Sequence, residues 1–259
     1  MVRHSARDFF ISIKTYIVHL TRTEKKGKEG KSRLMDQVRQ ASTTKQHIYL
    51  FRVQNMRNSL FKSLRACLEG RFFIGKNRVM AIALGHDESS ELLPGISHLT
   101  RGLKGDLGLL CTDVAPNALN DLFASRETQV YARTGNLAIM TVVIEADDGG
   151  LRNVATGELL SATQEPQLRQ AGVPTKLRGG AILLSADNYT VCSAGEQLTV
   201  DQARILKIFG IKMATFKVEL AAHYHNGTYE EYELEELAVG TTRNDADMSD
   251  AEVSDEAAN

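Results

Sequence analysis

The chain has 259 residues, of which 42% are hydrophobic and 24% are charged, as in ordinary soluble globular proteins. No apolar run approaches the roughly 20 residues that a bilayer-spanning helix needs, so no such helix is predicted. The three cysteines, Cys67, Cys111 and Cys192, are odd in number and far apart. They indicate neither a disulfide framework nor a metal site, and they favour a reducing intracellular compartment.

Charge is divided unevenly along the chain, although the formal net charge is only −1. Residues 1–105 carry 20 basic and 8 acidic side chains, a net of +12, whereas residues 106–259 carry 11 and 24, a net of −13. Residues 228–259 alone hold eleven acids and one base. Such asymmetry is typical of nucleic-acid binding at one end and an acidic tail at the other, although a chance partition of surface charge gives the same counts.

Hydrophobic patterns predict strands that alternate with helices over the first half of the chain, which indicates an α/β layer structure. Leu60, Leu64, Cys67 and Leu68 fall on one face of a helix and are predicted to pack in the core. The other predicted elements are a loop at 21–31, helices at 33–40, 79–84, 115–125 and 201–209, and strands at 48–53, 71–74, 106–111, 138–145, 180–184, 189–191 and 214–222.

The pattern changes after residue 137, where short strands replace the helices. Residues 162–180 hold no helix of ordinary length, and a helix signal returns only at Thr199, where Thr199 and Gln202 fit a capping box. We therefore predict one α/β domain that is interrupted by a smaller, strand-rich module. The predicted bounds are 1–20 for an atypical N-terminal extension, 21–137 and 196–229 for the discontinuous α/β domain, 138–195 for the inserted domain, and 230–259 for an acidic disordered tail.

The strongest functional signal is a cationic edge within residues 52–78, which carry seven basic side chains and one acid, Glu69. Lys76, Asn77 and Arg78 follow a predicted strand, where such side chains can reach the phosphates and 2′-hydroxyls of folded RNA. Residues 25–31 hold four lysines that form either a solvated segment or an RNA-facing arm and nuclear-entry signal.

Two enzymatic or metal-binding patterns are incomplete. Gly75 and Lys76 resemble part of a phosphate loop, but Asn77 replaces the hydroxyl that would reach magnesium. His223 and His225 would share one face of a strand, but no third metal ligand follows at suitable spacing, so they are predicted to be surface histidines. No carboxylate cluster lies beside the basic edge, which disfavours a nuclease or a nucleotide hydrolase.

Several ordered motifs resemble one known family. The similarity extends from about residue 20 to about residue 229 and is highly specific. Its motifs are NMRN (55–58), FFIGKNRVM (72–80), LKGDLGLL (103–110), YARTGN (131–136), EPQLRQ (165–170), LTVDQAR (198–204), LKIFG (206–210) and MA (213–214). Through them the chain resembles the ribosome assembly factors of the mRNA turnover protein 4 family, paralogues of the large-subunit stalk-base protein of the L-ten/P-zero group.

This resemblance implies an α/β, stalk-base-type (ribosomal L-ten-like) RNA-binding domain with an inserted domain. It also implies a non-enzymatic protein without cofactors, found in the nucleolus and nucleus and, on late particles, in the cytoplasm. Its partners would be 25S/28S rRNA, the pre-60S particle and neighbouring large-subunit proteins, and it would be a monomer within the particle. It would occupy the rRNA site of the later GTPase-associated centre until the stalk-base protein replaces it, and so serve large-subunit biogenesis and rRNA processing.

The alternative function is that of the stalk-base ribosomal protein itself. After Leu237 the sequence lacks the pair of long helices and the closing apolar motif of stalk proteins, which favours an assembly factor. Residues 9–18 also depart from the family, whose members begin with a short lysine-rich leader. With this resemblance in view, the predicted RNA-binding residues are Asn55, Arg57, Asn58, Lys62, Lys76, Asn77 and Arg78, with Lys104 and Arg133 at the margin.

Overall fold

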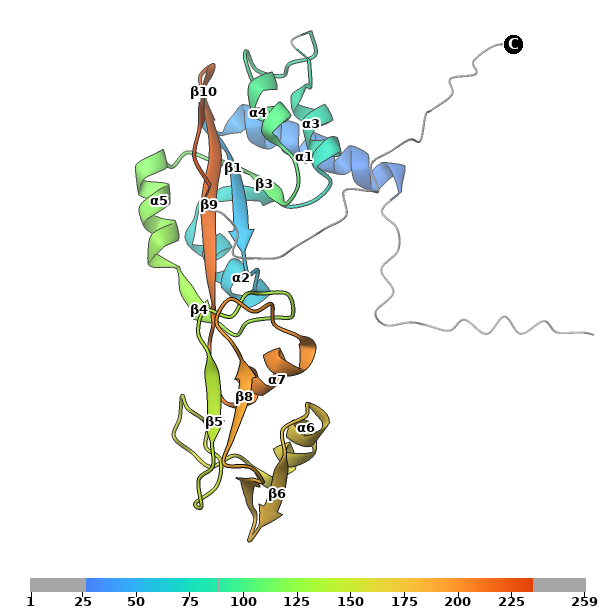
Figure 1. Cartoon of the computed structure of the whole chain (residues 1–259). Helices are drawn as coiled ribbons and strands as arrows, with labels where there is room; N and C mark the ends of the chain where they lie inside the picture. The colour runs from blue at the N-terminus through green and yellow to red at the C-terminus, as the bar shows by residue number, and fades with distance from the viewer. Residues whose placement is uncertain (1–26, 88, 235–259) are drawn as a thin grey trace, which may run out of the picture.

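The chain folds into a larger sheet-and-helix part and a smaller part that extends from one end of it (Figure 1). The computed structural model describes residues 27–87 and 89–234. The predicted extension at 1–20 and most of the predicted tail lie outside these residues. No helix in the described part of the chain is both long and apolar enough to cross a membrane.

The larger part is built on a six-stranded sheet with the order β10-β9-β1-β3-β2, in which β4 also pairs with β9. All of these pairs are antiparallel. β9 pairs with β1 along the whole length of β1, from His47 opposite His225 to Gln54 opposite Lys217. The strands are β1 (His47–Gln54), β2 (Gly70–Phe73), β3 (Leu107–Thr112), β4 (Thr128–Val130), β9 (Ala214–His225) and β10 (Thr228–Glu231).

Helices cover both faces of this sheet because its central strands alternate apolar side chains between the faces. Tyr49 and Phe51 point to the face covered by α2 (Asn58–Cys67) and α5 (Pro116–Ser125). Ile48 and Leu50 point to the opposite face, where they join a core formed with the other helices of this part. Those helices are α1 (Lys28–Thr44), α3 (Asn77–Leu84) and α4 (Ser97–Gly102).

The inserted part follows β4 and returns to the sheet at β9. It contains two separate two-stranded sheets, β5 with β8 and β6 with β7. The capping box predicted at Thr199 is present and begins α7, with Gln202 as its reciprocal partner. The elements are β5 (Val142–Glu145), a short 3-10 helix η1 (Ala162–Gln164), α6 (Glu165–Gln170), β6 (Thr175–Arg178), β7 (Ala181–Leu184), β8 (Asn188–Cys192) and α7 (Val200–Ile208).

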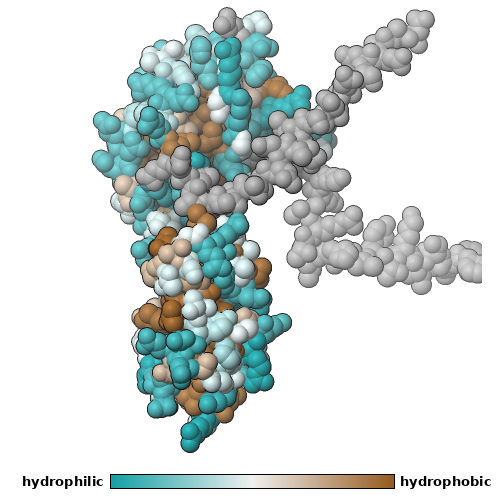
Figure 2. All heavy atoms as spheres, viewed as in Figure 1, coloured by the Kyte–Doolittle hydropathy of each residue, from teal (hydrophilic) through white to brown (hydrophobic). Residues whose placement is uncertain are grey.

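A continuous hydrophobic core runs from the α2/α5 face of the sheet into the inserted part, so the two parts pack against each other. The inserted part also leaves apolar side chains at its surface, which Figure 2 shows as brown areas on the lower half of the molecule. The exposed ones include Ile139, Met140, Val143, Val154, Leu159 and Leu177. Its surface is therefore partly apolar, in contrast to the basic edge predicted for the larger part.

Several sequence-based expectations were wrong. Among the described residues, the end of the predicted loop and the short helix at 33–40 are replaced by α1, a 17-residue helix that begins at Lys28. Its charged first turns are exposed, and burial of Val38 and Ala41 holds it on the sheet. Lys28 and Lys31 therefore lie on a helix, whereas the lysines at positions 25 and 26 lie outside the described residues.

The predicted start of the tail was also wrong. β10 includes two acids that had been assigned to the tail, at positions 230 and 231, because its backbone pairs with β9.

Cys67 was also misplaced, because it is exposed at the end of α2 rather than packed in the core. The buried stripe of this helix is formed by Phe61 and Leu64 and continues at Leu68, so the helix is rotated relative to the predicted stripe. Three strands of three or four residues, β4, β6 and β10, were not predicted at all.

Candidate nucleic-acid interface

One end of the large sheet gathers the predicted RNA-binding residues. β1 and β2 both pair antiparallel with β3, so their carboxyl ends lie where β3 begins. β9 begins and β4 ends in the same direction along the sheet, just beyond the carboxyl end of β1, because Gln54 pairs with Lys217 and Val130 pairs with Ala214. We call the nine side chains at these strand ends the rim: Asn55, Arg57, Asn58 and Lys62 after β1, Lys76, Asn77 and Arg78 after β2, Lys104 before β3, and Arg133 after β4.

Exposure divides the rim into two groups. Six of its members are exposed: Asn58, Lys62, Lys76, Arg78, Lys104 and Arg133. Asn55, Arg57 and Asn77 are half-buried. Five of the exposed side chains are cationic, so the surface that this end of the sheet offers to a ligand is mainly positive. Asp106 is an exposed acid in the same loop as Lys104.

Each half-buried member holds a backbone carbonyl of another segment. Asn55 Nδ2 donates to Thr215 O at 2.8 Å, and Asn77 Nδ2 donates to Gly105 O at 2.8 Å. Arg57 Nη2 donates to the carbonyl oxygen of Tyr131. These bonds connect the ends of β1 and β2 to the neighbouring loops, so the loops that carry Lys104 and Arg133 are tied to the rim.

The positive charge of Arg133 affects the pKa of Arg57. Burial lowers the pKa of Arg57, and the positive charge of Arg133 lowers it further. Two guanidinium groups are therefore held close enough to repel each other. An anion bound between or beside them would relieve that repulsion.

Two helices begin at the rim without the usual caps. α2 has Arg57 as its N-cap and α3 has Lys76, neither with a side-chain cap, and neither helix has an acid in its first turn. α5, which does not begin at the rim, also lacks a side-chain cap and a first-turn acid, whereas α7 has both a capping box and Asp201 in its first turn. The amino-terminal end of a helix carries free N–H groups and a partial positive charge, so the two rim helices favour a bound anion such as phosphate.

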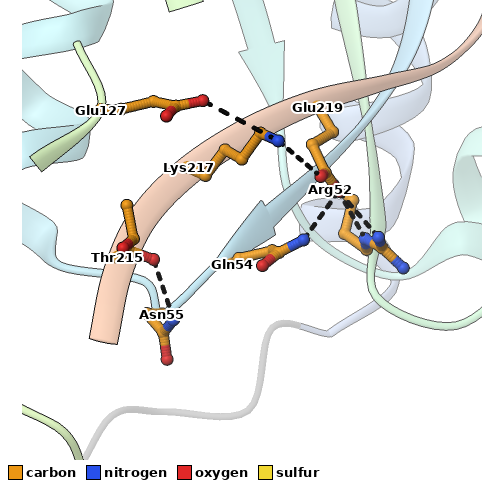
Figure 3. Close-up of polar contacts among 7 residues, drawn as sticks. All are labelled: Arg52, Gln54, Asn55, Glu127, Thr215, Lys217 and Glu219. Atoms are coloured by element: carbon orange, nitrogen blue, oxygen red, sulfur yellow. Dashed lines mark hydrogen bonds and ion pairs between the residues drawn. The ribbon is translucent and has the colours of Figure 1, made fainter. Parts of the chain in front are cut away.

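A neutralised polar network lies on the sheet behind the rim (Figure 3). Glu219 accepts hydrogen bonds from Arg52 Nη2 at 2.7 Å and from Gln54 Nε2 at 2.9 Å, and Lys217 lies 3.3 Å from its other oxygen. Burial alone would raise the pKa of Glu219, but the hydrogen bonds from Arg52 and Gln54 outweigh it and lower the pKa. Arg52 and Lys217 therefore pair with Glu219 and stabilise the contact between β1 and β9.

The histidines lie at the opposite end of the sheet, and the prediction that His223 is a surface residue is wrong. His223 is buried, stacks on Tyr49 at 4.6 Å between ring centroids, and shares a 2.9 Å hydrogen bond with Nδ1 of His47. His225 stacks on His47 at 4.3 Å. Among the described residues, no group of three or more His, Cys, Asp or Glu is placed to hold a metal ion.

Sequence reasoning missed the partners that position the rim. Asn136, Thr215 and Gly105 were not candidates, yet each accepts or donates a hydrogen bond to a rim side chain. Only Asn136 had a local signal, because it ends the Gly-Asn turn after Arg133. Thr215 and Gly105 contribute backbone oxygens, which carry no sequence signature.

Comparison with known proteins agrees with this architecture. Residues 26–127 match the family described as Ribosomal protein L10, and residues 132–211 match the insertion domain described for the 60S ribosomal proteins of that family. The predicted fold class, an α/β L-ten-like domain that is interrupted by a smaller inserted domain, is thus confirmed.

Individual relatives give the more specific assignment. The ribosome assembly factor mrt4 of Schizosaccharomyces pombe is 41% identical over 82% of this chain and 90% of that protein. The ribosome assembly factor MRT4 of Saccharomyces cerevisiae is 32% identical over 83% of this chain and 93% of that protein. The large ribosomal subunit protein uL10 of Thermococcus onnurineus is 28% identical over 74% of this chain, which spans 54% of that protein. The chain therefore belongs to the family of the ribosome assembly factor mrt4.

Proposed function

We propose that this protein is a non-enzymatic ribosome assembly factor that binds the rRNA of the large-subunit precursor through the rim. Its site is the stalk-base region of 25S/28S rRNA, the later GTPase-associated centre. The protein occupies this RNA surface on the pre-60S particle until the stalk-base ribosomal protein replaces it. Occupancy of the site, rather than a chemical reaction, is the function, and it supports large-subunit assembly and rRNA processing.

The observation that carries the proposal is the convergence of three positive features at one end of the sheet. Five exposed cationic side chains, two uncapped helix ends and the repelling pair Arg57 and Arg133 all favour bound phosphate. They come from segments that are far apart in sequence, and the antiparallel pairing of the strands brings these segments toward one end of the sheet. A surface of this kind fits a folded RNA backbone, which offers several phosphates at once.

Relatives support ribosomal RNA as the nucleic acid. The relatives with the higher identity are named as ribosome assembly factors, and a ribosomal protein of the large subunit shares the fold at lower identity. An assembly factor and a ribosomal protein that share this fold can compete for one RNA surface. We infer that the protein acts in the nucleolus and nucleus as a monomer within the particle, and remains on late particles in the cytoplasm.

Binding to a transcribed stalk-base rRNA fragment tests the proposal. The variant Lys76→Ala/Arg78→Ala should bind about tenfold more weakly at physiological salt, because phosphate contacts dominate affinity. The slope of log K against log salt should also become shallower by about 1.5, since each lost contact contributes roughly 0.7 to 0.9.

The matched control is Lys176→Ala/Arg178→Ala, which removes one exposed lysine and one exposed arginine from β6 in the inserted part. It should leave affinity and slope unchanged. Equal effects of the two double variants would show that net charge, rather than the rim, governs binding.

The association with the pre-60S particle can be tested separately, by purifying the tagged protein and identifying the rRNA that accompanies it. Recovery on translating ribosomes would favour the alternative function of a stalk-base ribosomal protein.

A further inference from the structure

Asn55 joins three segments of the chain at the end of β1. Its backbone has a φ of +49°, in the left-handed region that few residues other than glycine and asparagine adopt readily. Its Oδ1 accepts a hydrogen bond from Asn136 Nδ2 at 2.6 Å, while its Nδ2 donates to Thr215 O at 2.8 Å. One amide group therefore contacts both the connection that leads into the inserted part and the strand that follows it.

The turn that contains Asn136 belongs to both parts of the molecule. Asn136 Oδ1 accepts from the backbone N–H of Arg133 at 3.1 Å, which closes the turn on itself. The backbone of Gly135 donates to Leu198 O at 2.9 Å, and Leu198 donates back to Asn136 O at 2.8 Å. The outgoing and returning chains of the inserted part are thus paired at this turn, and the turn also carries Arg133 of the rim.

We propose that the Asn55–Asn136 pair is a latch that sets the orientation of the inserted part and, with it, the position of Arg133 for RNA. Asn55 is then a positioning residue rather than an RNA contact. This inference rests on the proposed function only where it concerns RNA.

Three observations support a latch over an ordinary loop contact. Both ends of the Asn55 amide bond to other segments of the protein, which fixes the orientation of this side chain. Asn55 and Asn136 are each half-buried, so their hydrogen bond is partly shielded from water. Arg57, which lies two residues after Asn55, donates a hydrogen bond to the carbonyl of Tyr131 on the same connection, so two side chains at the end of β1 contact this segment.

The variant Asn55→Gly removes the amide while keeping a backbone that tolerates a positive φ. Asn136→Ala removes the other half of the pair. The matched control is Asn226→Gly, because Asn226 has a φ of +46° but lies in the turn between β9 and β10, at the far end of the sheet.

The distance between the two parts can be measured by pulsed electron paramagnetic resonance on the full chain. Spin labels would be placed at Ser125→Cys on α5 and Lys176→Cys on β6, both exposed, in a Cys67→Ser background that removes the exposed native thiol. We expect Asn55→Gly and Asn136→Ala to broaden the distance distribution and Asn226→Gly to leave it unchanged.

Affinity for the stalk-base rRNA fragment supplies the second measurement. Asn55→Gly removes both hydrogen bonds of this amide and should weaken RNA binding by about fivefold. Arg133→Ala should then cost less affinity in the Asn55→Gly chain than in the natural chain, because Arg133 is already misplaced. Melting temperatures of the variants near that of the natural chain exclude global unfolding as the cause.

Other outcomes overturn the latch. Weaker RNA binding with an unchanged distance distribution would make Asn55 a direct RNA contact. A broadened distribution with unchanged affinity would show that orientation does not matter for RNA. Failure of the proposed function itself is distinguishable, because Lys76→Ala/Arg78→Ala would then bind the fragment normally.

Discussion

Asn77 joins the start of α3 to the loop that carries Lys104, through a 2.8 Å hydrogen bond from its Nδ2 to the carbonyl oxygen of Gly105. Asn77 lies between Lys76 and Arg78 in sequence, so a single side chain links cationic residues that come from two different strand ends. The positive surface at the rim is therefore held together by a neutral amide.

Asn77→Ala should weaken binding to the rRNA fragment by about fivefold and lower the free energy of unfolding by about 1 kcal/mol, the usual contribution of one hydrogen bond. Titration at fixed salt and urea unfolding measure the two effects. The control is Asn117→Ala, which removes an exposed asparagine from the first turn of α5, away from the rim. If Asn77→Ala leaves RNA affinity unchanged, the contribution of Lys104 to binding does not depend on the hydrogen bond from Asn77 to Gly105.

Arg78→Glu should change stability and binding in opposite directions. An acid in the first turn of α3 interacts favourably with the helix dipole and should stabilise the fold by about 0.5 kcal/mol. The same charge should repel phosphate and weaken RNA binding by about tenfold or more. Lys176→Glu in the inserted part is the control for charge reversal elsewhere. Parallel losses of stability and binding would instead mean that Arg78 supports the fold.

Glu219→Gln should destabilise the protein by about 2 kcal/mol, because it removes the carboxylate that faces Arg52 in a largely buried pair, with 9% and 13% of the side chains exposed. Since the pKa of Glu219 is lowered in the folded protein, its contribution is present above the ordinary glutamate pKa and is lost as the pH falls through the folded value. Urea unfolding at neutral and acidic pH measures this contribution. Glu158→Gln, at an exposed position, should have no comparable effect.

The histidine pair predicts a second pH dependence. His47 Nδ1 and His223 Nε2 share one proton in a 2.9 Å hydrogen bond, so both rings cannot be protonated there. Burial lowers the pKa of His223, and the charge of His47 lowers it further. Burial also lowers the pKa of His47, and the charge of His225 lowers that pKa further. Because the unfolded chain binds protons more readily, stability should fall as the pH drops below about 6.5.

Thermal unfolding at about pH 7.5 and about pH 5.5 tests this dependence. His223→Gln should reduce the difference between the two melting temperatures, whereas His98→Gln, at an exposed position, should not. An equal difference in both variants would assign the pH effect to other groups.

The sequence was sufficient for the longer elements and insufficient for the short ones. Helices with a clear apolar face and strands with buried runs, such as β1 and β3, were found close to their observed bounds. β4 has only three residues and pairs with a segment of β9 far along the chain, which no local window contains. β10 has only four residues and follows β9 after Asn226 and Gly227, so this hairpin had a local turn signal that was missed. α1 was shortened because its start is rich in charge, and its packing on the sheet could not be read from composition.

The rim is defined by the nine residues predicted from the sequence, and the sequence did not indicate the different hydrogen-bonding roles within it. Asn55, Arg57 and Asn77 have the same residue types as RNA-contacting side chains. Their hydrogen bonds reach carbonyls of Thr215, Tyr131 and Gly105, which are 160, 74 and 28 residues away in sequence. Only the topology of the sheet brings these groups together.

The position of β9 in the chain has a consequence for biosynthesis. β9 is the partner of β1 along the whole of that strand, yet it is translated after the entire inserted part. During translation β1 can pair with β3 early, while its other edge stays open until residue 225 has left the ribosomal tunnel. Completion of the large sheet must therefore wait for late synthesis, and nascent chains that stall within the inserted part expose an unpaired strand that is prone to aggregate.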